Sequence, residues 1–148
     1  MGFNAMATTK TLLDFDRSND EQSALCDDLE RIADALPGHV DQARTLKVAE
    51  RISLVLGRAH DFEENEVFPL LEARASESSM VKSALGRFRS EHEQDAYFAE
   101  EVREALIDFA TSEKAMAPDA LGYMLRGFFI SLRRHIAVER EMVDLVLG

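Results

Sequence analysis

The sequence predicts an all-α protein, an up-down-up-down four-helix bundle built from two similar helix pairs. Glycine and proline are scarce, at 7 and 3 of 148 residues, which suits long helices better than a sandwich or a barrel. Apolar residues recur at steps of three and four along four long stretches. The two halves also share a pattern, since "LGRAHDFEENEVFPLL" resembles "LRRHIAVEREMVDLVL". We expect one bundle over residues 15–148 after an N-terminal extension of residues 1–14.

The first helix pair is expected to cover residues 17–75. Its first helix should start near "RSNDEQ", where Ser18 or Asn19 can cap it, and should end at Pro37-Gly38. The second helix should run from about residue 40 to 75, with a kink or a short final turn at Pro69. The apolar stripe of the first helix consists of Leu25, Leu29, Ile32 and Leu36.

The second helix pair follows short connections, which favour antiparallel neighbours. The third helix should begin after "SESS" and end near "TSEK". The fourth should begin at Pro118, because proline is favoured in the first turn of a helix. Its inner stripe contains two polar residues among eight: Leu121, Leu125, Phe128, Leu132, His135, Glu139, Met142 and Val146.

Charge and cysteine content exclude several classes of function. The formal net charge of -11 argues against nucleic acid and against an anionic membrane surface, both of which attract clustered lysine and arginine. Most carboxylates are expected to be solvated on the surface. Cys26 is the single cysteine, so we expect a buried thiol and no internal disulfide. Without a signal pattern or an 18-residue apolar run, the expected location is cytoplasmic.

Polar residues on the inner stripes raise the question of a binding site. His60 and Glu64 lie four residues apart, as do His135 and Glu139, so each pair shares one helix face. Folding the pairs together should bring His92 to the same depth. Burying these groups is costly unless they are paired or bind a metal, and their donors suit iron, manganese or zinc. The alternatives are a buried polar network or helix ends open to water; for His39, a cap or a surface position is expected.

The motifs "HDFEENEVFP", "EHEQ" and "HIAVE" resemble those of the hemerythrin-like (HHE cation-binding) family, over about residues 15–147. The resemblance implies a non-haem di-iron centre, oxo-bridged in some states, that binds or senses dioxygen, nitric oxide, redox state or iron. It implies that the ligands are His60, Glu64, His92, His135 and Glu139, with the two glutamates bridging. Asp61 could add a carboxylate, although an outward, solvated role fits it equally. Manganese or zinc could replace iron.

The sequence departs from the family pattern at two places. The first-helix histidine of the family is absent, because Asn19 stands there with Asp20 beside it. Oxygen carriers have a further histidine on the third helix, where this chain has Phe88 and Ala96, with Asp95 as the nearest ionisable residue. A shell richer in carboxylates favours an oxidised metal. Oxygen activation, redox or iron sensing, or a site for one ion is therefore expected ahead of reversible oxygen carriage.

Three function classes follow from these observations. The leading one is a metal-binding and sensing protein whose ligands are metal ions and dioxygen or another small gas. The second is a peroxide- or oxygen-reducing di-iron enzyme, although the ferritin-like motif Glu-x-x-His would need glutamate at Gly57 and Leu132. The third is a metal-free interaction module. There "GFFISL" and "MVDLVLG" would join a homodimer interface, whereas helical spacing favours a core role for them.

Overall fold

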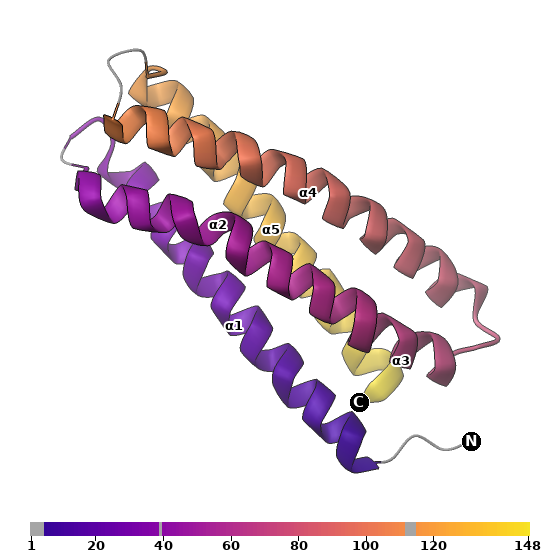
Figure 1. Cartoon of the computed structure of the whole chain (residues 1–148). Helices are drawn as coiled ribbons and strands as arrows, with labels where there is room; N and C mark the ends of the chain where they lie inside the picture. Colours follow the sequence, from indigo (N-terminus) through magenta and orange to yellow (C-terminus); the bar gives the residue numbers. More distant parts are fainter. Residues whose placement is uncertain (1–4, 39, 112–114) are drawn as a thin grey trace.

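The computed structural model describes residues 5–38, 40–111 and 115–148, and these contain helices and no strand (Figure 1). Four helices are long: α1 (Ala5–Ala35), α2 (Gln42–Phe62), α4 (Ser79–Thr111) and α5 (Pro118–Leu147). A π-helical turn, η1 (Glu63–Val67), and the short helix α3 (Phe68–Arg74) continue α2 without a break. The all-α prediction is confirmed. His39 lies outside the described residues.

The four long helices lie side by side in one bundle. Helix α1 packs against α2 and α5, and α4 packs against the same two helices. In Figure 1 the end of α1, the start of α2, the end of α4 and the start of α5 lie at one end of the bundle. The start of α1, α3, the start of α4 and the end of α5 lie at the other end. The middles of the long helices therefore meet at a common level.

Three of the four predicted helices agree closely with the structure. Together, α2, η1 and α3 cover the second predicted helix, and Pro69 lies in the first turn of α3 as expected. The Asp41 carboxylate accepts a hydrogen bond of 3.2 Å from the backbone N–H of Arg44 and so caps α2. Helix α5 begins at Pro118, and α4 begins and ends where the sequence indicated.

The predicted start of the first helix is wrong, because α1 begins at Ala5. Ser18 and Asn19 therefore lie inside the helix and do not cap it. The inner stripe extends toward the N-terminus through the buried residues Thr8 and Phe15, at steps that continue to Asn19 and Gln22. This burial outweighs the local capping preference. The domain boundary at residue 15 stays a prediction.

The core consists of two apolar clusters, and each long helix except α2 contributes to both; η1 and α3 continue α2 into the second cluster. The large cluster lies toward the α1–α2 connection and includes Leu25, Leu29, Ile52, Leu56, Val102, Leu106, Leu125, Phe128, Phe129 and Leu132. The small cluster lies toward the opposite end and includes Phe15, Val67, Phe68, Leu71, Val81, Leu85, Phe88 and Val143. Cys26 is fully buried in the large cluster, as predicted.

The apolar segments of α5 are divided between core and surface. Phe128 and Phe129 are buried, which confirms their core role, whereas Ile130 and Leu145 are exposed. Across the described part of the chain, no helix has both the length and the apolar character needed to cross a bilayer.

Candidate metal centre

A layer of buried polar side chains separates the two apolar clusters. On α1, α4, α5 and the continuous segment from α2 to α3, these residues lie between the last position of one cluster and the first position of the other. None of them exposes more than 8% of its surface. We call this set the polar layer: Asn19, Gln22, His60, Glu63, His92, His135 and Glu139. Because buried polar groups destabilise a core unless they find partners, their contacts decide what this layer can do.

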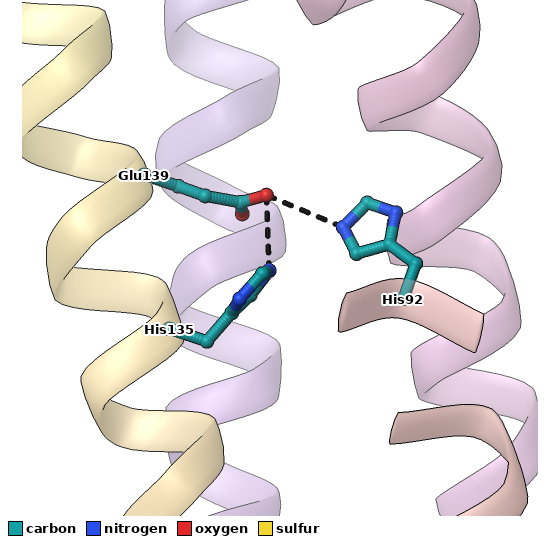
Figure 2. A group of neighbouring side chains, drawn as sticks. All are labelled: His92, His135 and Glu139. Atoms are coloured by element: carbon teal, nitrogen blue, oxygen red, sulfur yellow. Dashed lines mark hydrogen bonds and ion pairs between the residues drawn. The ribbon is translucent and has the colours of Figure 1, made fainter. Parts of the chain in front are cut away.

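Glu139 lies between two histidines from different helices. His92 Nε2, on α4, donates a hydrogen bond of 3.2 Å to Oε1 of Glu139, and His135 Nε2 lies 3.0 Å from the same oxygen (Figure 2). His135 and Glu139 are one turn apart on α5, so both point to the same side of that helix. Ligand atoms of these three residues lie within 4.8 Å of one another, a spacing that one cation can bridge.

Glu63 is a buried carboxylate that the sequence analysis missed. Its side chain is 1% exposed, and its Oε2 lies 3.0 Å from Nε2 of His92. Glu64, the expected residue, lies 3.3 Å from Nδ1 of the same ring, but its side chain is 39% exposed. The sequence could have indicated Glu63, because residues three and four positions after His60 both share its helix face.

Glu63, the buried one of these two glutamates, is the first residue of the π-helical turn η1. In η1 the backbone N–H of Phe68 donates to the carbonyl of Glu63, five residues earlier, instead of the usual four. Glu63 is the first residue of this wider turn and Val67 is the last, and both side chains are buried in the core. Single π-turns within α-helices are rare and are frequent at functional sites.

The three predicted histidines converge. The rings of His60 and His92 stack with centroids 3.9 Å apart, and the rings of His92 and His135 lie 5.3 Å apart. The structure therefore brings together five of the predicted site residues: His60, Glu64, His92, His135 and Glu139. Asp61 and Asp20 are exposed and do not belong to the polar layer. Asn19 is buried in it; the sequence had indicated that Asn19 stands in place of the family's first-helix histidine.

Burial and charge act in opposite directions on the histidines. Burial, together with the positive charge of the neighbouring His92, lowers the pKa of His60 to about 3, so this ring stays neutral. Burial also opposes protonation of His92 and His135, but adjacent carboxylates, Glu139 foremost, outweigh it. They raise the pKa of His92 to about 10 and that of His135 to about 9. Without a metal, His92 and His135 are therefore both protonated beside the buried carboxylates.

The carboxylates respond to the same environment in different ways. Burial alone would raise the pKa of Glu139, but its contacts with His135 and His92 outweigh burial and hold that pKa well below its usual range. Burial raises the pKa of Glu63, which shares the site with the charged Glu139. In this layer Glu139 is therefore ionised, whereas a further cation beside Glu63 would favour the ionised form of its carboxylate.

Several buried atoms of the layer lack a hydrogen-bond partner. They are Nε2 of His60, Oε2 of Glu139 and both amide atoms of Asn19. Leaving buried lone pairs unpaired costs about 1 to 3 kcal/mol per group, so such a cluster indicates a missing partner. Neutral imidazole nitrogens with carboxylate oxygens suit iron, manganese and zinc ions. The residues present therefore fit a metal cation.

Comparison with known proteins supports this assignment. Residues 12–143 match the sequence profile of the hemerythrin HHE cation-binding domain, which covers most of the chain. The chain belongs to this family. No curated protein and no solved structure matches it. The family assignment establishes cation binding as the property of this hemerythrin HHE domain, and His92, His135 and Glu139 form a group that could hold the ion.

One contact outside the polar layer orients a histidine of this hemerythrin HHE domain. Nδ1 of His135 lies 2.7 Å from Oε2 of Glu91, a half-buried carboxylate on α4. A neutral His135 ring that carries its proton on Nδ1 donates a hydrogen bond to Glu91. Its Nε2 then carries the lone pair, on the side of Glu139. Histidines that bind metals commonly have a partner of this kind on the opposite nitrogen, which fixes the tautomer and the orientation of the ring.

Proposed function

We propose that the domain binds a pair of metal ions, iron foremost, in the polar layer, and that it senses or reacts with dioxygen, nitric oxide, redox state or iron. The supporting observation is the convergence of His92 and His135 on Glu139, with the ring of His60 stacked on that of His92. We place this layer midway along an up-down-up-down bundle formed by two similar helix pairs. Manganese or zinc would use the same donors.

The proposed ligands are the buried residues of the layer. They are His60, Glu63, His92, His135 and Glu139, with Glu64 at the edge of the site. Glu139 contacts histidines of both α4 and α5, so we assign it as a bridging carboxylate. Glu63 takes the second bridging role, which the sequence had given to Glu64. Asp20 and Asp61 are left out because they are exposed.

The protein's own groups prepare the site for a cation. His60 is neutral and therefore free to donate its lone pair, whereas His92 and His135 must release their protons when a metal binds. The apolar clusters on either side limit the access of water. A bound iron pair would supply the redox chemistry and the affinity for small gases. The carboxylate-rich shell favours the oxidised metal, so sensing is proposed ahead of reversible oxygen carriage.

The proposal is tested by removing ligands from two helices. Wild type and two double variants, His60→Ala/His135→Ala and Glu93→Ala/Glu141→Ala, are loaded anaerobically with ferrous iron, desalted and analysed for iron. Wild type and the second variant, whose changes are exposed on the same bundle, should retain about two irons per chain. The histidine variant should retain none while circular dichroism shows intact helices. Equal iron content in both variants would refute the site, and no iron in wild type would favour a metal-free interaction module.

The cytoplasmic location and a homodimer stay predictions from the sequence. Exclusion of nucleic acid and of membrane surfaces rests on the acidic charge alone.

A further inference from the structure

A pocket between α4 and α5 leads to the polar layer. Its volume is about 240 Å³, and its wall includes Glu91 and Asp95 from α4 and Arg134 and His135 from α5. His135 is 93% buried, yet it lines this wall. Its Nδ1 contacts Glu91, another residue of the wall, and its Nε2 lies 3.0 Å from Oε1 of Glu139 in the polar layer. The pocket therefore reaches from the surface of the molecule to one of the proposed ligands.

The charged groups of the pocket differ in their existing contacts. Glu91 is engaged with His135 at 2.7 Å. Oδ2 of Asp95 is buried, and no group in the described part of the chain donates a hydrogen bond to it. Arg134 forms no ion pair with the residues that the structure describes. The pocket thus offers one uncommitted carboxylate close to the layer, with one uncommitted cationic side chain in the same wall.

We propose that this pocket is the route by which a divalent cation enters the polar layer, with Asp95 as the transient contact on the way and Arg134 as an opposing charge. The inference rests on the proposed metal site. Charges that line a narrow pocket change the local concentration of an ion and hence its association rate. Neither Asp95 nor Arg134 belongs to the proposed ligand set, so both should act on the rate of uptake rather than on the final amount of metal.

The test measures the rate of cobalt(II) uptake by the full chain, followed through the visible absorption of the bound ion in a stopped-flow instrument. Asp95→Asn should slow uptake by about threefold, and Arg134→Gln should accelerate it by a similar factor. These opposite effects, together with their absence in charge changes made away from the pocket, are expected if the ion passes between the two residues. Added salt should reduce both effects, because it screens charges beyond about a Debye length.

Matched controls carry the same changes of charge elsewhere. Asp108→Asn lies about 20 Å farther along α4, and Arg44→Gln lies at the end of the bundle near the α1–α2 connection. Both residues are exposed, and both variants should take up cobalt at the wild-type rate.

The outcomes distinguish a failure of the proposed entry route from a failure of the proposed metal site. If Asp95→Asn and Arg134→Gln take up cobalt like their controls, at unchanged stoichiometry, the entry route is overturned and the metal site stands. If Asp95→Asn binds fewer ions at saturation, Asp95 is a ligand and its role in entry is overturned. If wild type with intact helices takes up no cobalt, the proposed function itself fails.

Discussion

His92 is the residue with the most contacts in the polar layer. Its ring stacks on His60, its Nε2 faces Glu63 and Glu139, and its Nδ1 faces Glu64. One imidazole has two nitrogens and cannot satisfy three carboxylates at once. The arrangement is therefore most readily satisfied when additional cationic charge shares these carboxylates with the ring.

The two neighbouring glutamates should differ in their effect on metal affinity. Glu63→Gln should weaken binding by at least about tenfold, because it removes the charge of a buried carboxylate in contact with His92. Glu64→Gln is the matched change at a half-exposed position and should weaken binding less. Calorimetric titration with manganese(II) measures both affinities. The reverse order would restore Glu64 as the ligand and remove Glu63 from the set.

The stability of the metal-free protein should fall as the pH rises above 6.5. The folded protein holds the pKa of His92 at about 10 and that of His135 at about 9, both above the unfolded value of about 6.5. A group whose pKa is higher in the folded state stabilises the fold fully at a pH below its pKa in the unfolded state. This stabilisation is lost as the pH rises through the pKa of the group in the folded state. Urea unfolding at pH 6.5 and pH 9.5 measures the loss.

Metal affinity should change with pH in the opposite direction. Both imidazoles must be neutral to bind a metal, so affinity should rise over the same pH interval in which metal-free stability falls.

Stability of the metal-free protein that is constant from pH 6.5 to 9.5 would show that these histidines are not charged in the metal-free layer.

Asn19 should be replaceable by an apolar residue of similar size. Its side chain is 4% exposed, and neither of its polar atoms makes a hydrogen bond. Asn19→Leu should therefore stabilise the metal-free protein by about 1 kcal/mol, because it removes an unpartnered buried amide. Chemical denaturation gives the free energy of unfolding. A clear loss of stability would mean that the amide has a partner in solution.

The element that sequence periodicity could not predict is η1. The i,i+4 rule assumes 3.6 residues per turn and selected Glu64, whereas the π-turn buries Glu63. No propensity distinguishes these adjacent glutamates; the choice depends on how the following Val67 and Phe68 pack in the small cluster. His92, His135 and Glu139 lie on regular helices, and for them periodicity was sufficient.

Shortening the π-turn should separate stability from metal binding. Deletion of the exposed Asn65 would allow a regular helix through η1, with equal or higher thermal stability but weaker metal binding, because Glu63 loses its inward position. Deletion of the exposed Glu50 in α2 is the control. It turns one half of a regular helix by about 100° and should unfold the large cluster. Unchanged metal affinity after deletion of Asn65 would show that the π-turn has no role in the site.

At the scale of the whole molecule, the polar layer is flanked by two independent apolar clusters. The bundle therefore does not depend on the layer for its hydrophobic core, and variants of the ligands should keep their helices. The same arrangement explains why sequence patterning predicted the class of the fold, since α1, α4, α5 and the continuous segment from α2 to α3 each repeat the order of apolar, polar and apolar positions. The start of α1 was missed because Thr8, Asn19 and Gln22 are polar yet buried.

Metal binding should stabilise the whole bundle. A ligand that binds only the folded state stabilises it by about 2.7 kcal/mol at a concentration one hundred times its dissociation constant. Manganese(II) should accordingly raise the midpoint of thermal unfolding of wild type and leave that of His60→Ala/His135→Ala unchanged. An equal rise in both proteins would indicate binding by surface carboxylates.

X-ray absorption spectroscopy of the iron-loaded protein shows whether iron binds in the polar layer or elsewhere, which matters because 28 acidic residues offer iron many other positions. A first shell of mixed nitrogen and oxygen, with the outer-shell scattering of imidazole rings, is expected if iron lies among His60, His92 and His135. An oxygen-only shell without imidazole scattering would contradict the account and place the metal on surface carboxylates.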